Sequence, residues 1–313
     1  MCYHGEMDLI YPPALQKGDT IGIVAPSSFI ESDKLDIGVA ALRSHGFEVK
    51  IHPQTLAREN QSAGGVAEKV SAFHEMILDS SVKAIMAAGG GNRSAHILDS
   101  LDYDLIRANP KIYIGFSDST ALLSAISSRS GLACMHGPMV KTLAHTDREC
   151  VEFMFQVLSG KTPHFPFEAA KGIKEGSATG RLIGGNLGTF CSLVGTPYMP
   201  PTAGAILFLE DINEELSRVD RMLWHLRKAI PFSKLSGIIF GQFMNMQDTG
   251  RPFGYSLDDI LHEHTSDLSI PVVTNAPFGH GPALYPLPVG CLGTLDVAAT
   301  DVGFRLETSP VTA

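Results

Sequence analysis

The sequence has little of what marks secreted, membrane-bound or nucleic-acid-binding proteins. Only five of its 313 residues are cysteine, and none stands in the spacing of a metal finger or a redox pair. No apolar run is long enough to cross a bilayer, and the first residues lack the apolar stretch of a secretory signal. The formal net charge of -9 has the wrong sign for attraction to a phosphate backbone or an anionic lipid surface. We therefore expect a cytoplasmic protein with reduced thiols and with no nucleic-acid or membrane partner.

The chain contains instead a regular alternation of strand-like and helix-like segments. Its hydrophobic content of 44% is sufficient for a buried core. Apolar stripes of helical period, such as Leu35, Val39 and Leu42, separate short buried runs of strand type. In the first half of the chain these runs are 20–25, 48–52, 82–88, 112–115 and 132–136. The alternation predicts an α/β fold with a mostly parallel sheet.

The length predicts two domains. Residues 163–176 lose the periodicity of their surroundings and contain two prolines. We therefore expect an N-terminal domain over 1–162, a linker over 163–176 and a C-terminal domain over 177–313.

The segment GFSDST places small polar residues between a predicted strand and a predicted helix. It follows the strand at 112–115, and ligands and catalytic groups collect at such carboxyl ends in open α/β sheets. Ser117 resembles the serine of a nucleophile elbow, whose tight turn exposes the hydroxyl, and Gly115 permits close packing there. The usual elbow has glycine two residues after the serine, where this chain has Ser119. The alternative is that Ser117, Asp118 or Ser119 only caps the following helix.

A glycine run, Gly89-Gly90-Gly91, follows the strand predicted at 82–88. Such a turn presents backbone N–H groups to an anion, either a phosphate or an oxyanion. It does not match the dinucleotide-binding fingerprint, because Ser94 stands where the third glycine belongs, and it lacks the lysine of a P-loop. The alternative is a tight turn that needs glycine only for its backbone conformation.

Two later segments carry titratable side chains after predicted strands. The run AILFLE ends in Glu210 and Asp211, which could act at the sheet edge or simply begin a helix as solvated acids. His280 lies in a loop with glycine and proline neighbours that could hold its ring in place, although a loop histidine is commonly structural. His262 and His264 lack the HExxH spacing and diverge on a helix, so we expect no metal site there.

These motifs occur in an order that resembles a known family. The segments are KGDTIGIVAPSS, the glycine turn, LDYDLIRANPKIYIGFSDSTALL, HGP, GRLIGGNLGTFCSLVGTPY, ILFLED, RVDRML, GIIFGQF and PFGHGP. Over nearly its whole length the chain resembles the serine LD-carboxypeptidases of the muramoyl-tetrapeptide type, which are related to the microcin C self-immunity peptidases. The resemblance implies a Rossmann-like N-terminal domain with a parallel sheet, a smaller mixed α/β C-terminal domain, and a homodimer.

The resemblance also implies roles for individual residues. Ser117 matches the nucleophile, Glu210 the acid and His280 the base of a catalytic triad. Backbone N–H groups of Gly90 and Asp118 would form the oxyanion hole. No cofactor and no metal is implied, because a neutral histidine oriented by a carboxylate is sufficient to activate a serine hydroxyl.

Substrate contacts are expected around the glycine turn. Gly89, Gly91 and Asn92 belong to this turn, and Arg93 or Arg181 are candidates for binding a terminal carboxylate. The reaction implied by the resemblance is hydrolysis of the L,D-amide bond between the third residue and the terminal D-alanine of a murein tetrapeptide, in cell-wall recycling. The third residue would be meso-diaminopimelate or L-lysine.

Two other functions stay open on the sequence. Ala88 followed by GGGN replaces the arginine and GGYG that close relatives often carry, and is nearer to the immunity peptidases, which would cleave aminoacyl-nucleotide analogues. The short passage from LED to RVDRML instead favours the recycling branch. The third interpretation is a non-catalytic α/β protein that binds a nucleotide phosphate at the glycine turn, but it leaves the LED and FGHG segments unexplained.

Overall fold

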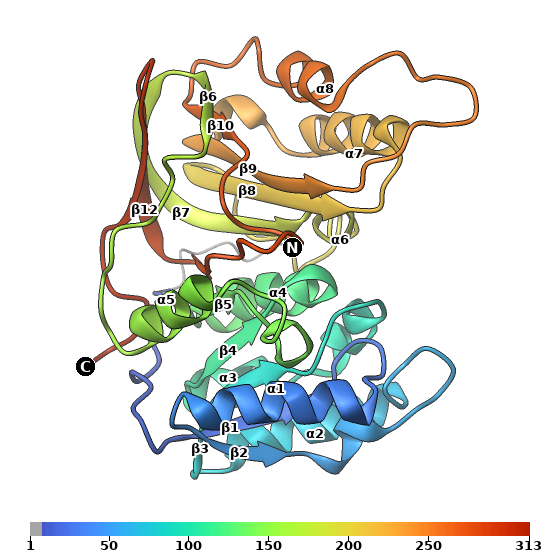
Figure 1. The fold of residues 1–313 in the computed structure, drawn as a ribbon, viewed down its shortest axis with the longest axis vertical. Helices are drawn as coiled ribbons and strands as arrows, with labels where there is room; N and C mark the ends of the chain where they lie inside the picture. The colour runs from blue at the N-terminus through green and yellow to red at the C-terminus, as the bar shows by residue number, and fades with distance from the viewer. Residues whose placement is uncertain (1–7) are drawn as a thin grey trace.

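Within residues 8–313, which the computed structural model describes, the first β-sheet has six strands in the order β11-β5-β4-β3-β1-β2 (Figure 1). Strands β1 to β5 run parallel to one another, and β11 pairs antiparallel with β5. The bounds are β1 Thr20–Val24, β2 Glu48–Ile51, β3 Val82–Ala87, β4 Ile112–Gly115, β5 Cys134–His136 and β11 Leu287–Val289. The parallel sheet expected for the N-terminal half is confirmed.

The strand order of this sheet reverses at β1. From β1 the chain passes through α1 (Ser32–Ser44) to β2 at the sheet edge, and α2 (Val66–Leu78) then carries it back to β3 on the other side of β1. The loops after β1 and β3 therefore lead away in opposite directions. In open α/β sheets this point of divergence is where ligands bind.

The helices around the first sheet form because apolar residues recur on one face. In α1 the buried face contains Leu35, Val39 and Leu42, and in α2 it contains Phe73 and Ile77. The others are α3 (Tyr103–Ala108), α4 (Thr120–Ser130) and α5 (Arg148–Leu158). Short 3-10 helices lie at η1 Pro53–Leu56, η2 Ser94–Ser100, η3 Ser117–Ser119, η4 Val140–Thr142 and η5 Phe232–Lys234.

The second sheet, counted over the same described residues, has seven strands in the order β13-β12-β7-β8-β9-β10-β6. Its centre, β7 to β10, is parallel, whereas β12, β13 and β6 pair antiparallel. The bounds are β6 Lys171–Lys174, β7 Gly176–Asn186, β8 Ala205–Ile212, β9 Gly237–Met244, β10 Val272–Thr274, β12 Leu292–Val297 and β13 Val302–Leu306. The helices are α6 (Leu187–Cys191), α7 (Leu216–Ala229) and α8 (Leu257–Glu263). This mixed sheet agrees with the expected mixed α/β second half.

Two local features differ from the sequence-based expectations. Part of the expected linker, 171–174, is strand β6, which gains order by pairing with β10 at the sheet edge. Residues 287–289 return to the first sheet as β11, where Pro288 is tolerated because β11 is an edge strand.

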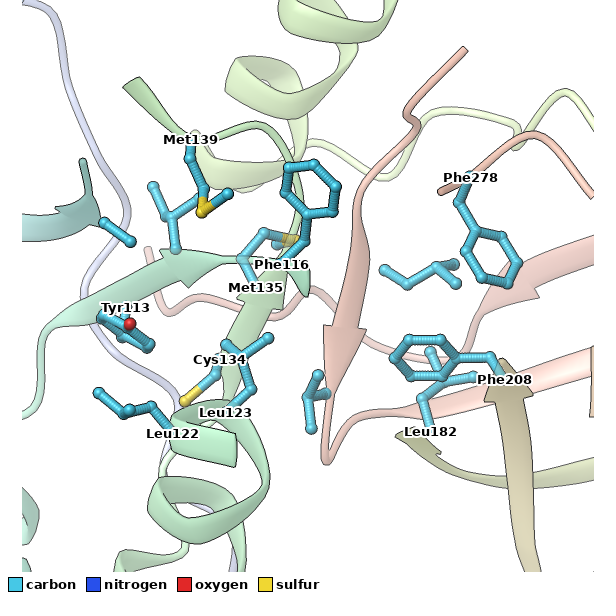
Figure 2. Close-up of a cluster of buried hydrophobic side chains, with 14 of the residues drawn as sticks. Tyr113, Phe116, Leu122, Leu123, Cys134, Met135, Met139, Leu182, Phe208 and Phe278 are labelled. Atoms are coloured by element: carbon cyan, nitrogen blue, oxygen red, sulfur yellow. The ribbon is translucent and has the colours of Figure 1, made fainter. Parts of the chain in front are cut away.

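Helix α4 lies between the two sheets and packs against both (Figure 1). Seven of its residues from Thr120 to Ile126 are buried, so this helix has no solvated face along that stretch. Figure 2 shows the apolar core that continues across the junction, with Phe116 and Met135 of the first half on one side and Phe208 and Phe278 of the second half on the other. A shared apolar core thus holds the strand ends of both halves against one another.

Two sequence-based expectations concern the cysteines, expected as free thiols, and the lack of a bilayer-spanning segment. Cys134, Cys150, Cys191 and Cys291 are buried free thiols, and Cys2 lies outside the described residues. Among residues 8–313, no helix combines the length and the apolar character needed to span a bilayer.

Candidate active site

Ser117 lies in a strained turn between β4 and α4. Its backbone φ is +59°, in the left-handed region that L-residues rarely adopt. Gly115 makes the turn possible, because a Cβ at this position would lie 2.7 Å from Ser119 Cβ. Phe116 and Ser119 are the N-cap residues of η3 and α4, and neither makes a side-chain capping hydrogen bond. Capping therefore does not explain these serines. The turn therefore has the geometry of a nucleophile elbow.

His280 connects the two halves of the molecule through hydrogen bonds on both sides of its ring. Its Nε2 lies 3.0 Å from Ser117 Oγ, and its Nδ1 lies 2.6 Å from Glu210 Oε2. Ser117 follows a strand of the first sheet, whereas Glu210 lies in β8 of the second sheet and His280 in the loop after β10. The three side chains thus form a continuous hydrogen-bonded series from Ser117 through His280 to Glu210.

Close backbone packing holds the acid and the histidine in place. Glu210 is fully buried at the end of β8, so it is not the solvated acid of the alternative interpretation. Gly279 has φ +125°, and a Cβ there would lie 3.2 Å from Glu210 Cβ and 2.9 Å from the carbonyl of Gln242. Gln242 N–H also donates to the carbonyl of Phe278. The glycine thus lets the His280 loop lie directly against β8 and β9.

The charge of the site favours a basic histidine. Burial disfavours the imidazolium form of His280, but the hydrogen bond and charge of Glu210, together with the charge of Asp211, raise its pKa above the ordinary value of 6.5. A raised pKa makes the His280 ring a stronger proton acceptor, which suits it to the role of a general base.

Asp211 forms a buried network beside the triad that sequence reasoning did not assign. Burial raises the pKa of Asp211, although its carboxylate accepts hydrogen bonds from Asn186 Nδ2 at 2.8 Å and from the Gly188 N–H at 3.0 Å. Asn186 N–H in turn donates to Thr120 Oγ1 at 3.0 Å, in the first turn of α4. The GGN and LED segments were the sequence signal for this network, which ties the helix after Ser117 to the strand that carries Glu210.

His136 is a second buried residue whose position the sequence did not indicate beyond the HGP motif. It is fully buried, and neither ring nitrogen has a hydrogen-bond partner among the described residues. Its ring makes edge-on contacts with Phe116, Phe208 and Phe278. Burial, with a smaller contribution from His280, lowers its pKa to about 3. His136 is therefore neutral at physiological pH and packs as part of the apolar wall behind Ser117 and His280.

The glycine turn after β3 lies directly beside the elbow. A Cβ on Gly90 would lie 3.1 Å from Ser117 Cβ, and a Cβ on Gly91, which has φ +112°, would lie 2.2 Å from Ser28 Oγ. Gly89 lies near the side chain of Lys141. Glycine is thus required because the turn packs closely against Ser117 and Ser28, and not only because of the backbone conformation of the turn.

Asp118 and Asn92 brace this turn. Asp118 Oδ2 accepts a hydrogen bond from Ser94 N–H at 2.9 Å, and its carbonyl accepts one from Ser94 Oγ at 2.6 Å. Asn92 N–H donates to Ser28 Oγ at 3.3 Å, and its side chain donates to Gln61 Oε1 at 3.1 Å. The expected oxyanion-hole residues, Gly90 and Asp118, therefore flank Ser117 on two connected segments.

The two arginines considered for a terminal carboxylate lie in different places. Arg93, with φ +78°, follows the glycine turn, and the next residue, Ser94, donates hydrogen bonds to Asp118. Arg181 lies in β7 five residues before Asn186, about 17 Å along the strand from the edge that carries Glu210, and it donates to the carbonyl of Gly290. Of the two arginines, Arg93 is therefore the one joined to the segment that contacts Asp118, next in the chain to Ser117.

His264, the second of the two histidines that lack HExxH spacing, contacts an aspartate. His264 is buried and its Nε2 lies 2.9 Å from Asp220 Oδ1. Across residues 8–313, no group of three or more histidine, cysteine, aspartate or glutamate side chains is arranged to hold a metal ion.

Comparison with known families gives matches on both halves of the chain. Residues 21–137 match the model of the LD-carboxypeptidase N-terminal domain, and residues 179–295 match that of the LD-carboxypeptidase C-terminal domain. Together these cover well over half of the sequence.

Individual relatives match over nearly the full length. A probable murein peptide carboxypeptidase of Bacillus subtilis is 34% identical over 94% of this chain and 94% of its own length. The murein tetrapeptide carboxypeptidase of Pseudomonas aeruginosa is 30% identical over 88% and 92%, respectively. The microcin C7 self-immunity protein MccF of Escherichia coli is 28% identical over 90% and 92%. A solved structure of MccF in complex with aspartyl sulfamoyl adenosine has a TM-score of 0.89 at 26% identity, covering 97% of this chain and 100% of that one.

Proposed function

This chain belongs to the LD-carboxypeptidase family, and from that premise we propose that it is a serine peptidase acting on murein tetrapeptides. The bond cleaved is the L,D-amide between the third residue, meso-diaminopimelate or L-lysine, and the terminal D-alanine. The relatives named murein peptide and murein tetrapeptide carboxypeptidase support this substrate class. The observation that carries the mechanism is the pair of hydrogen bonds from one histidine ring to Ser117 and Glu210.

The first half of the reaction forms an acyl-enzyme. Ser117 Oγ attacks the amide carbonyl carbon while its proton passes to Nε2 of His280. Glu210 accepts the hydrogen bond from Nδ1, which holds the required tautomer and stabilises the imidazolium. When the tetrahedral intermediate collapses, the C–N bond breaks and His280 returns the proton to the nitrogen of the departing D-alanine.

The second half hydrolyses the ester. Water gives a proton to His280 and adds to the acyl carbon, and the collapse of this intermediate returns the proton to Ser117 Oγ and releases the tripeptide. In both halves the oxyanion is bound by the backbone N–H groups of Gly90 and Asp118. Each such donor contributes a factor of about 10² or more to the rate.

The setting of the enzyme is part of the same proposal. A murein tetrapeptide released from the wall is a cytoplasmic recycling substrate, which fits the absence of a disulfide among the four described cysteines. We assign the protein to the cytoplasm and to homodimers. We also propose a division into residues 1–162, a linker at 163–176 that contains strand β6, and residues 177–313, with residues 287–289 exchanged into the first sheet.

The decisive test is release of D-alanine. The purified full chain is incubated with the free tetrapeptide and with the disaccharide tetrapeptide, and D-alanine and tripeptide are quantified. We expect equimolar release of both products, and a loss of about 10⁴-fold or more in Ser117→Ala. Undiminished release by the folded Ser117→Ala protein would contradict the nucleophile assignment.

A second candidate function uses the same triad on an aminoacyl-nucleotide analogue. It is favoured by the GGGN turn and by the similarity to MccF. The same preparation is compared on the tetrapeptide and on an aminoacyl sulfamoyl adenosine. A kcat/KM for the adenosine compound that is higher than kcat/KM for the tetrapeptide would assign the chain to the immunity type instead.

A further inference from the structure

Three phenylalanine rings surround the buried ring of His136. The centroid distances from His136 are 5.8 Å to Phe116, 5.3 Å to Phe208 and 6.0 Å to Phe278. The interplanar angles are 75°, 76° and 89° in the same order, so each pair is close to perpendicular. In such pairs the edge of one ring meets the face of the other, which is a favoured arrangement of aromatic rings. The contacts with His136 therefore restrict the orientation of all three phenylalanines.

Each of these phenylalanines is a close neighbour in the chain of one triad residue. The pairs are Phe116 with Ser117, which are adjacent, and Phe208 with Glu210 and Phe278 with His280, which are each two residues apart. Glu210 lies on the same face of β8 as Phe208, because alternate residues of a strand share a face and β8 pairs with β7 in unbroken register. Phe116 also contacts the ring of His280, with 4.9 Å between the centroids. A movement of any of these rings therefore reaches the triad within one or two residues.

The backbone of His136 is itself fixed beside the elbow. Strand β5 lies between β4 and β11, and His136 pairs with Gly115 of β4 and with Leu287 of β11. The next residue, Gly137, donates its N–H to the carbonyl of Gly115 at 3.1 Å. Because Gly115 is two residues before Ser117, strand pairing anchors the His136 ring to the segment that carries the nucleophile.

Stability alone does not favour a histidine at this position. The side chain is fully buried, and both ring nitrogens lack a hydrogen-bond partner among residues 8–313. An apolar side chain would fill the same space without leaving polar atoms unpaired. Burial lowers the pKa of His136 to about 3, so the ring stays uncharged and does not repel the imidazolium that His280 forms during the reaction. Residues that break a packing rule in this way are expected at functional sites.

We propose that His136 is a positioning residue of the catalytic triad and acts through the three phenylalanine rings. This inference rests on the proposed function, because it concerns the same triad, and extends it to a residue that does not touch the substrate. Proton transfer requires Nε2 of His280 to stay within hydrogen-bonding distance of Ser117 Oγ while Nδ1 keeps its contact with Glu210. The three triad residues come from separate segments, and the contacts with His136 keep those segments aligned.

The test replaces His136 with leucine, which has a similar volume but no ring. We expect kcat for D-alanine release to fall by about 10- to 100-fold, because a displacement of about 1 Å at a reacting group has an effect of this size on the rate. KM should be unchanged, because His136 is buried and does not contact the substrate. A folded His136→Leu protein with the kcat of the wild type would overturn the proposal.

Proton NMR of the free protein gives a readout that a loss of stability alone does not move. The proton between Nδ1 of His280 and Oε2 of Glu210, which are 2.6 Å apart, should give a separate downfield resonance, because a short charge-assisted hydrogen bond deshields its proton. In folded His136→Leu this resonance should move upfield or broaden. An unchanged resonance contradicts the positioning role, and kcat decides alone if exchange with water hides the resonance in the wild type.

Phe165→Leu is the matched control. Phe165 is also buried and also makes nearly perpendicular ring contacts, at 70° with Phe153 and at 84° with Phe304, but none of these three rings is a chain neighbour of a triad residue. This variant should lose stability and keep the wild-type kcat and resonance. If it lowers kcat as much as His136→Leu does, the effect of His136 is one of stability, and the positioning role is overturned.

The outcome for this inference is separable from the outcome for the proposed function. If the wild type cleaves the aminoacyl sulfamoyl adenosine and not the tetrapeptide, the substrate assignment is wrong, and the effect of His136→Leu on kcat is measured with the adenosine compound. A wild type that cleaves neither contradicts the proposed function, and the resonance then tests whether His136 holds the contact between Glu210 and His280.

A second variant covers the case in which His136→Leu does not fold, as judged by circular dichroism. Phe278→Leu removes one of the three ring contacts of His136 and should lower kcat by about 10-fold with KM unchanged. The kcat of the wild type in folded Phe278→Leu would then overturn the inference.

Discussion

Gly90 lies so close to Ser117 that a Cβ on the glycine would be 3.1 Å from Ser117 Cβ and 3.2 Å from its Oγ. An alanine at this position has to displace the glycine turn or the nucleophile, and either movement disturbs the proposed oxyanion hole. We predict that Gly90→Ala lowers kcat for D-alanine release by about 10²-fold or more, with a small change in KM.

Gly250→Ala is the control for this prediction. A Cβ on Gly250 meets no atom within 4 Å, and its φ is not in the positive region. This variant should retain wild-type kcat and thermal stability. Equal kcat in the two variants would show that the contact of Gly90 with Ser117 has no part in catalysis.

Glu210→Gln keeps the shape of the side chain but removes the charge that His280 Nδ1 contacts. We predict a fall in kcat/KM of about 10⁴-fold, because the neutral amide does not hold the ring tautomer or stabilise the imidazolium. The residual activity should also have a shifted pH dependence. In the wild type, activity falls as pH drops through the raised pKa of His280, and without Glu210 this acidic limb moves to lower pH.

The matched control is Glu75→Gln on the surface. Glu75 makes the same type of contact, with Oε2 3.0 Å from Nε2 of His52, but its side chain lies exposed on α2. Its kcat/KM and pH profile should equal those of the wild type. If the acidic limb of the pH profile of Glu210→Gln lies at the same pH as that of the wild type, Glu210 does not set the pKa of His280.

His136 should make the protein less stable in acid. Its pKa is about 3 in the folded state against 6.5 for an ordinary histidine, so below pH 6.5 the unfolded chain binds a proton that the folded protein excludes. The free energy of unfolding then falls by up to about 1.4 kcal/mol for each pH unit below 6.5. Urea unfolding at pH 7 and pH 4.5 should show a smaller loss in His136→Phe, by about 2 kcal/mol.

His164→Phe, at an exposed position, provides the comparison for His136. It should lose stability in acid as the wild type does. If His136→Phe and the wild type lose the same free energy between the two pH values, His136 is not buried in its neutral form.

The sequence by itself was sufficient for the α/β architecture, the parallel first sheet and the strand ends that carry polar groups. These are local properties: the apolar period distinguishes strand from helix, and glycine or small polar residues mark where a strand ends. Ser117, Gly90, Glu210 and His280 were therefore found from their positions after predicted strands and from the ordered motifs of the family.

Only the tertiary structure decided which of these strand ends meet. His280 is 163 residues from Ser117 and 70 from Glu210, and no local pattern specifies contacts at such separations. The return of residues 287–289 to the first sheet depends in the same way on a partner strand far away in the chain.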